Sequence, residues 1–138
     1  MEIYSTDEQL IIKIENTLPT KYYSRITTIC DRDTEGKLLG MEVFLYEEPG
    51  INIDKIRRRF SGMREVEVNN DNLMYIHLRQ IPQLNHGPGF GRNAKVGITI
   101  DDLFSILIFD WNSLGAGTPS VDRFTALKGL DYILGYPE

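Results

Sequence analysis

The residues with the richest binding chemistry lie in one stretch, Asn85 to Lys95, with the sequence NHGPGFGRNAK. Its three glycines and one proline predict a loop, because they supply backbone angles that helices and strands do not use. Phe90 stands between two glycines, so a ligand can approach the backbone closely while the ring stays presented. Arg92 and Lys95 add positive charge beside it, and Asn93 adds an amide. These groups suit a base or ribose with its phosphates. The alternative is a polar connector between two halves of a domain.

Arginines elsewhere in the chain are further candidates to bind an anionic ligand. The run Arg57-Arg58-Arg59 is the most basic in the chain. Consecutive helical residues point about 100° apart, so the three arginines cannot all face the same way. One or two of them are expected to contact a phosphate, and the alternative is that the whole run is a charged face exposed to solvent. Arg123 is expected in the first turn of the last helix, where the helix dipole does not favour it, which indicates a ligand or a salt bridge. Arg25, on an expected strand, faces solvent or a ligand, with solvent favoured.

Catalytic and metal-binding motifs are missing from the sequence. Cys30 has no histidine placed near it by any motif, and there is no G-x-S-x-G, Walker or H-E-x-x-H pattern. His77 lacks a second nearby histidine or a cysteine pair, so it is not expected to bind a metal. The sequence therefore predicts a binding protein that is not an enzyme and needs no cofactor or metal, with a nucleotide-processing enzyme as the remaining alternative.

Size and charge narrow the class of protein. The 138 residues predict a single domain, 1–138, and the net charge of -5 argues against binding duplex nucleic acid. No apolar stretch is long enough to span a membrane, and the start of the chain does not read as a signal peptide. A single cysteine, Cys30, suits a reducing cytoplasm.

The first part of the chain, 1–82, is expected to be rich in β-strands. Thr6 with Gln9 predicts the start of a helix that ends at Pro19. Alternating patterns then predict two hairpins. A short helix capped by Asn52 should lie between them. The expected elements are strands Tyr22–Cys30, Leu38–Tyr46, Arg64–Val68 and Leu73–Arg79, and the helix Ile53–Phe60.

The rest of the chain is expected to be a Gly-rich loop, 83–98, followed by a helical hairpin, 99–138. Thr99 with Asp102 predicts a helix start, and the apolar residues that follow to Trp111 surround most of that helix. Thr118-Pro119 predicts the start of a last helix, Ser120–Leu134. The fold class is therefore α+β, with an antiparallel sheet and short helices followed by an antiparallel pair of C-terminal helices. This pair is expected to form a homodimer or a larger homo-oligomer.

Three segments give the chain a resemblance to a known family. They are Ile53–Phe60 (IDKIRRRF), the GFGRN segment at 89–93 and Thr118–Arg123 (TPSVDR). With the layout that surrounds them, which spans most of the chain, they resemble the phage anti-Thoeris family of signal sponges. The resemblance implies a protein in the host cell cytoplasm that binds a small cyclic nucleotide, a cyclic ADP-ribose variant. It also implies that the ligand is sequestered without being degraded, which blocks bacterial anti-phage defence.

Under this resemblance, six residues are expected to bind the ligand. Phe90 stacks on the purine. Arg92, Arg123 and Arg57 bind the pyrophosphate, and Asn93 and Asp110 bind the base edge or ribose hydroxyls. The competing interpretation is a small acidic interaction protein that inhibits a host protein by direct binding, in which case the loop is a connector.

Overall fold

A computed structural model describes residues 1–6, 8–79, 90–110, 127 and 133–135. Within them the chain forms one nine-stranded sheet in the order β5-β6-β4-β3-β7-β8-β2-β1-β9. All neighbouring strands are antiparallel except β1 and β9, which are parallel. The strands are β1 Glu2–Ser5, β2 Gln9–Lys13, β3 Lys21–Arg32, β4 Leu38–Val43, β5 Val66–Val68, β6 Met74–His77, β7 Phe90–Ile98, β8 Phe104–Asp110 and β9 Ile133–Gly135, with a 3-10 helix η1 Leu45–Glu47 and a helix α1 Ile53–Arg59.

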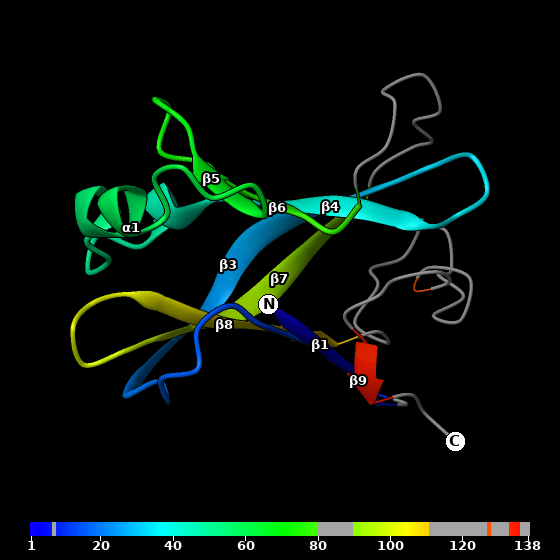
Figure 1. The fold of residues 1–138 in the computed structure, drawn as a ribbon, viewed down its shortest axis with the longest axis horizontal. Coiled ribbons are helices and arrows are strands. Elements are labelled where there is room, and N and C mark those ends of the chain that lie inside the picture. The colour runs from blue at the N-terminus through cyan, green and yellow to red at the C-terminus, as the bar shows by residue number, and fades with distance from the viewer. Residues whose placement is uncertain (7, 80–89, 111–126, 128–132, 136–138) are drawn as a thin grey trace.

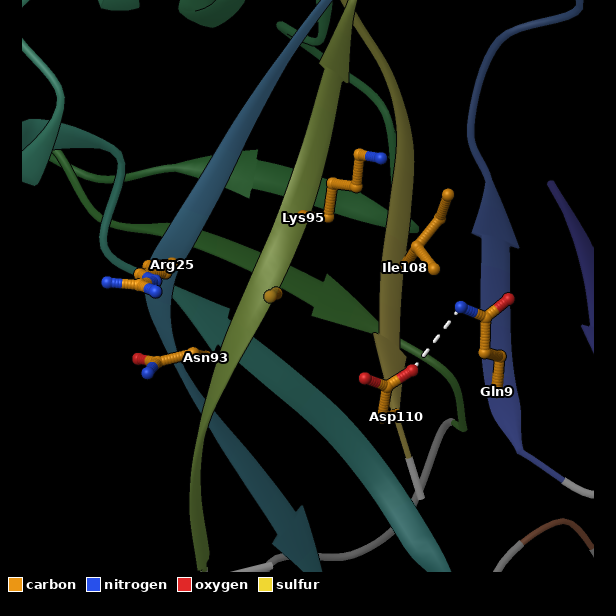
Figure 2. Close-up of a pocket in the computed structure, with 7 residues that line it drawn as sticks. Gln9, Arg25, Asn93, Lys95, Ile108 and Asp110 are labelled. Carbon is orange, nitrogen blue, oxygen red and sulfur yellow. Dashed lines mark hydrogen bonds between the residues drawn. The ribbon is translucent and has the colours of Figure 1, made fainter. Parts of the chain in front are cut away.

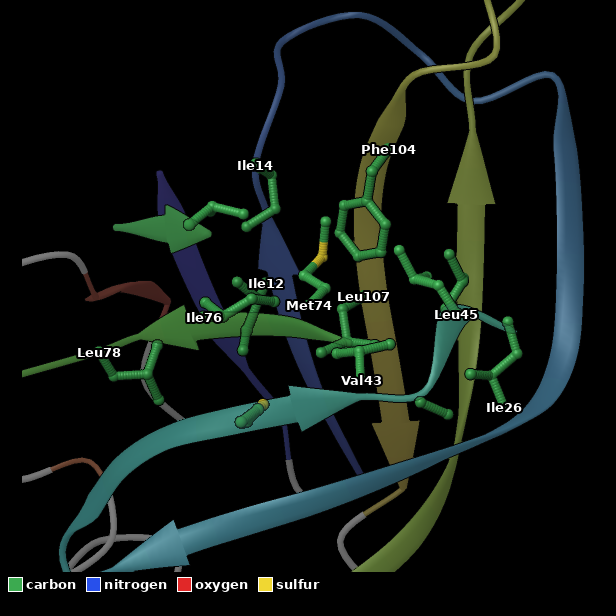
Figure 3. Close-up of a cluster of buried hydrophobic side chains, with 14 of the residues drawn as sticks. Ile12, Ile14, Ile26, Val43, Leu45, Met74, Ile76, Leu78, Phe104 and Leu107 are labelled. Atoms are coloured by element: carbon green, nitrogen blue, oxygen red, sulfur yellow. The ribbon is translucent and has the colours of Figure 1, made fainter. Parts of the chain in front are cut away.

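The sheet curls so that its two ends approach each other across one hydrophobic core. Strands β3 and β7 run diagonally between the β4–β6–β5 end and the β8–β1–β9 end (Figure 1). Side chains from both ends point into the same space (Figure 3), and Ile12, Val43, Ile76 and Leu107 are all fully buried there. One face of the curled sheet is therefore the core, and the other face carries the polar residues.

The predicted hairpins and short helix are confirmed. Strand β3 pairs with β4 and β5 pairs with β6, both antiparallel. The side chain of Asn52 accepts a hydrogen bond from the Lys55 backbone N–H at 3.1 Å, which is the predicted cap of α1. The local alternation and capping patterns were sufficient for these elements because each agrees with its packing.

The prediction of an N-terminal helix is wrong. The Thr6 hydroxyl does accept a hydrogen bond from the Gln9 backbone N–H, at 2.9 Å, as a helix cap would. Here that bond closes a tight turn between β1 and β2, and Ser5 pairs with Leu10 across it. The apolar residues of β2 alternate, with Leu10 and Ile12 buried in the core.

The α+β fold class with a C-terminal pair of helices is contradicted, because the protein is mostly β and 104–110 is a strand. The Thr99 hydroxyl accepts from the Leu103 backbone N–H at 3.1 Å and closes the β7–β8 turn. Strand β8 lies between β7 and β2, with Phe104 and Leu107 buried in the core and Ile106 and Ile108 partly buried, so its apolar residues do not simply alternate with polar ones. Periodicity alone does not separate such a strand from a buried helix.

The structure describes only part of the segments for which the remaining C-terminal predictions were made. Most of the expected helix Ser120–Leu134 lies outside the described residues. Leu127 is helical and fully buried, and Ile133–Gly135 is β9. Half of the expected Gly-rich loop, from Phe90 onward, is strand β7. An assembly through two C-terminal helices thus loses its basis, and association with a second copy stays a prediction. None of the described helices is long and apolar enough to cross a membrane.

Candidate functional site: a groove where the sheet divides

The sheet divides between its two middle strands. The pairing of β7 with β8 runs from Ile98–Phe104 to Lys95–Ile108 and ends there. Beyond that point β7 stays with β3 as far as Phe90, while β8 stays with β2 as far as Asp110. An open groove of about 280 Å³ lies at the division, lined by Gln9, Arg25, Asn93, Ala94, Lys95, Ile108 and Asp110 (Figure 2). We call it the fork groove.

A bulge in β3 brings Arg25 to the fork groove. The β3–β7 register jumps between Tyr23–Val96 and Ile26–Ala94, so Ser24 and Arg25 together oppose Lys95. Arg25 has a φ of 66°, in the left-handed region that residues other than glycine rarely adopt. Such a conformation costs about 1–3 kcal/mol, and it persists only where the surroundings impose it.

Glu47 of η1 holds the strand just after this bulge. Its carboxylate accepts from the Thr27 backbone N–H at 2.7 Å and from the Thr27 hydroxyl at 3.0 Å. Two bonds to one carboxylate fix the backbone beside the bulge, since charge-assisted hydrogen bonds are the stronger kind. The position of Arg25 is therefore set by the sheet register on one side and by Glu47 on the other.

Both cations of the fork groove lack an acidic partner among the described residues. The Arg25 guanidinium makes no hydrogen bond or ion pair there, and its side chain is exposed. The Lys95 ammonium lies 4.6 Å from the centre of the Tyr22 ring, a cation–π contact that orients the ammonium and leaves its charge in place. The β3–β7 side of the groove is therefore positive.

The opposite side of the fork groove presents oxygen acceptors. Gln9 donates its amide Nε2 to Asp110 Oδ1 at 3.3 Å, across the β2–β8 pair (Figure 2). Ala94 and Ile108 lie between the two polar sides. The groove thus combines cations, amides and one carboxylate around a small apolar strip, so its lining is more polar than that of most small-ligand sites.

Two of the six residues expected at the site, Asn93 and Asp110, line the fork groove. They come from β7 and β8, where a loop and a helix were expected. Phe90 and Arg92 have their backbone in β7, opposite Cys30 and Thr28, and their side chains lie outside the described part of the structure. Arg123 also lies outside it.

Arg57 does not belong to this groove. It forms an ion pair with Asp54 at 2.5 Å and donates to the Asn69 carbonyl at 3.2 Å and to the Asn72 side chain. These contacts tie α1 to the β5–β6 turn, so its expected role in binding pyrophosphate at this groove is not supported. Its neighbour Arg58 is exposed, as a solvated face requires.

Two lining residues, Gln9 and Arg25, were not among the expected ligand-binding residues, whereas Lys95 was noted for its charge beside Phe90. The signal for Arg25 is the break in alternation at Tyr23-Ser24-Arg25-Ile26, where two polar residues separate two inward-facing ones. An extra residue of this kind is how a bulge appears in a sequence. Gln9 carries no comparable signal, because its place in the groove depends on long-range pairing.

The described residues include no group of three or more His, Cys, Asp and Glu side chains that is suited to hold a metal ion. Comparisons of the chain with protein-family models, with curated proteins and with solved structures gave no match.

Proposed function

We propose that the fork groove binds a small phosphorylated ligand and that the protein holds this ligand without changing it chemically. The observation that carries the proposal is the pair of cations, Arg25 and Lys95, which line one groove without an acidic partner in the described structure. Arg25 is moreover held in a strained conformation. Backbone strain of this kind costs stability and is concentrated at functional sites.

The ligand class that the resemblance implies, a cyclic ADP-ribose variant, suits the chemistry of the groove. Its pyrophosphate would take charge-assisted hydrogen bonds from Arg25 and Lys95, and Asn93 adds an amide beside them. Because ligand pockets usually span about 300–1,000 Å³, the fork groove has room for the charged part of such a ligand rather than all of it.

We further propose that binding in the host cell cytoplasm sequesters the signal and so blocks anti-phage defence. A sponge must bind a scarce signal, which requires nanomolar affinity, or about -12 kcal/mol. The groove lies on strands of a paired sheet and is largely preformed, which favours tight binding because little ordering is needed.

A second candidate function is direct binding to a protein. Leu18 and Ile100 are each 77% exposed, which is unusual for large aliphatic side chains. Their loops lie close together, since the Thr20 backbone N–H donates to the Ile98 carbonyl at 2.8 Å. The replacement Leu18→Ser with Ile100→Ser would abolish partner capture under this alternative and leave nucleotide binding unaffected.

Titration calorimetry with cyclic ADP-ribose variants and ADP-ribose tests the proposal. Wild type should bind at least one of them, and Arg25→Ala should lose tenfold or more in affinity, about 1.4 kcal/mol. Arg58→Ala is the matched control, since it removes the same charge from an exposed position outside the groove. Chromatography of the released ligand should recover it intact. Equal binding by wild type and Arg25→Ala, or recovery of an altered nucleotide, would contradict the proposal.

A further inference from the structure

The bulge in β3 is held on both sides by residues 44–50, which we call the η1 segment. After the bulge, the Glu47 carboxylate accepts from the backbone N–H and the hydroxyl of Thr27. Before the bulge, the Tyr23 hydroxyl donates to the Gly50 carbonyl at 3.2 Å. The strand is therefore tied to one segment on either side of the bulge, which leaves the residues between the two contacts little freedom to rearrange.

The bond from Thr27 to Glu47 takes the place of a bond within the sheet. The Phe44 backbone N–H donates to the Thr27 carbonyl at 3.0 Å, which continues the β3–β4 ladder by one residue. Antiparallel strands exchange two bonds at such a pair, but the Thr27 N–H is bonded to the Glu47 carboxylate instead. Strand β4 gives way to η1 at this point, so Glu47 provides the acceptor that the departing strand does not.

The η1 segment is itself anchored in the core. Leu45 is fully buried, and Tyr23 packs against the hydrophobic cluster. A Cβ added at Gly50 would lie 3.0 Å from the Tyr23 hydroxyl oxygen and 3.3 Å from a carbon of its ring, so the backbone of the segment rests directly on this side chain. The segment is therefore a fixed support for the bulge.

We infer that Glu47 and Tyr23 are positioning residues that hold Arg25 in its left-handed conformation and keep its guanidinium at the fork groove. This inference rests on the proposed function and adds a control on its affinity. Neither positioning residue lines the groove, so each acts through the bulge. Without these contacts the strained conformation would be one of several, and only the fraction of molecules that adopt it would bind the ligand tightly.

Titration calorimetry of Glu47 variants tests the inference, with ADP-ribose, cyclic ADP-ribose and inorganic pyrophosphate as probes. Glu47→Ala should weaken binding about fivefold, because the competent conformation becomes less populated. Glu47→Gln should bind within about twofold of wild type, since its amide can accept from the Thr27 N–H and donate to the Thr27 hydroxyl. Glu35→Ala is the matched control, because it removes an exposed glutamate that does not line the groove, and it should leave affinity unchanged.

Two further series show whether Glu47 acts through Arg25. In an Arg25→Ala background, Glu47→Ala should change affinity by less than about twofold, because the residue that it positions is gone. In urea denaturation without ligand, Arg25→Gly should raise the midpoint of wild type. The same change should raise the midpoint of Glu47→Ala by less than about half as much, since a bulge that Glu47 no longer holds relaxes its strain. Tyr23→Phe, which loses only the bond to Gly50, should weaken binding less than Glu47→Ala does.

The outcomes separate the inference from the proposed function. Equal changes in affinity from Glu47→Ala and Glu47→Gln would show that Glu47 acts by its charge, which would overturn the inference while the groove remained an anion site. Weakening by the same factor with and without Arg25 would overturn it too. An equal gain in the urea midpoint from Arg25→Gly in both backgrounds would overturn it without any ligand. Absence of binding of every probe to wild type would refute the proposed function itself.

Discussion

Arg57 and Arg25 lie in two regions of the molecule that differ in whether the charged side chain is paired within the protein. Arg57 lies on α1 with its guanidinium bound to Asp54, Asn69 and Asn72. Arg25 lies at the fork groove in a left-handed conformation, without an ion pair among the described residues. The first arrangement satisfies the charge within the protein, and the second leaves it available.

Polar side chains in the region around β4, β5 and β6 are paired within the protein, as Arg57 is. The Tyr75 hydroxyl donates to Asp31 at 2.8 Å, and His77 Nε2 lies 3.1 Å from Glu67 Oε1. Polar groups that are paired within the fold contribute to stability. The polar face near β5 and β6 therefore contributes to the stability of the fold, whereas under the proposed function the fork groove gives up some stability for binding.

The largest expected effect belongs to the paired region. A Cβ added at Gly40 would lie 2.6 Å from the Ile76 carbonyl oxygen and 2.6 Å from the Tyr75 hydroxyl. Gly40→Ala must therefore shift the β4–β6 backbone and should lower the free energy of unfolding by about 2–3 kcal/mol, as overpacking does. Urea denaturation measures this. A loss below the error of the measurement would mean that Tyr75 is not packed tightly over Gly40.

Arg57→Ala should lower the free energy of unfolding by about 1–2 kcal/mol, because it removes a partly exposed ion pair and two further hydrogen bonds. Ligand affinity at the fork groove should not change. Arg58→Ala is the control and should alter neither property. Weaker ligand binding by Arg57→Ala than by Arg58→Ala would break the comparison, since Arg57 would then contribute to the binding site.

The smallest expected effect is the pH dependence that Tyr75 contributes. Burial, together with the hydrogen bond to Asp31, raises the pKa of the Tyr75 phenol. An unfolded tyrosine loses its proton near pH 10, so the stabilisation is complete below about pH 10 and is lost as the pH rises through the folded pKa. The stability of wild type should fall more steeply above pH 10 than that of Tyr75→Phe. If the stability of the two proteins fell equally with rising pH, Tyr75 would make no contribution to the pH dependence.

Local sequence patterns predicted two side-chain hydrogen bonds correctly but predicted the wrong secondary structure after them. The hydroxyls of Thr6 and Thr99 accept from backbone N–H groups three and four residues ahead, much as the cap patterns predict. In both places the bond closes a turn between strands, because the same short-range geometry serves a helix start and a tight turn. The choice between them is made by pairing with distant strands, which no local pattern contains.

The candidate site was predicted only in part for the same reason. Asn93 and Asp110 were chosen for their chemistry, and they do line one groove, although on strands rather than on a loop and a helix. The fork itself arises because β7 continues with β3 while β8 continues with β2. This division depends on pairings across most of the chain, as does the place of Gln9 opposite Asp110.

The most direct test of the central claim is a paired measurement on Arg25→Gly. Glycine adopts a φ of 66° without strain, so the free energy of unfolding should rise by about 1 kcal/mol. Ligand affinity should fall at least tenfold, because the guanidinium is lost. A more stable protein that no longer binds would show that stability is given up at the fork groove for binding. A variant that binds as tightly as wild type would contradict the account, whatever its stability.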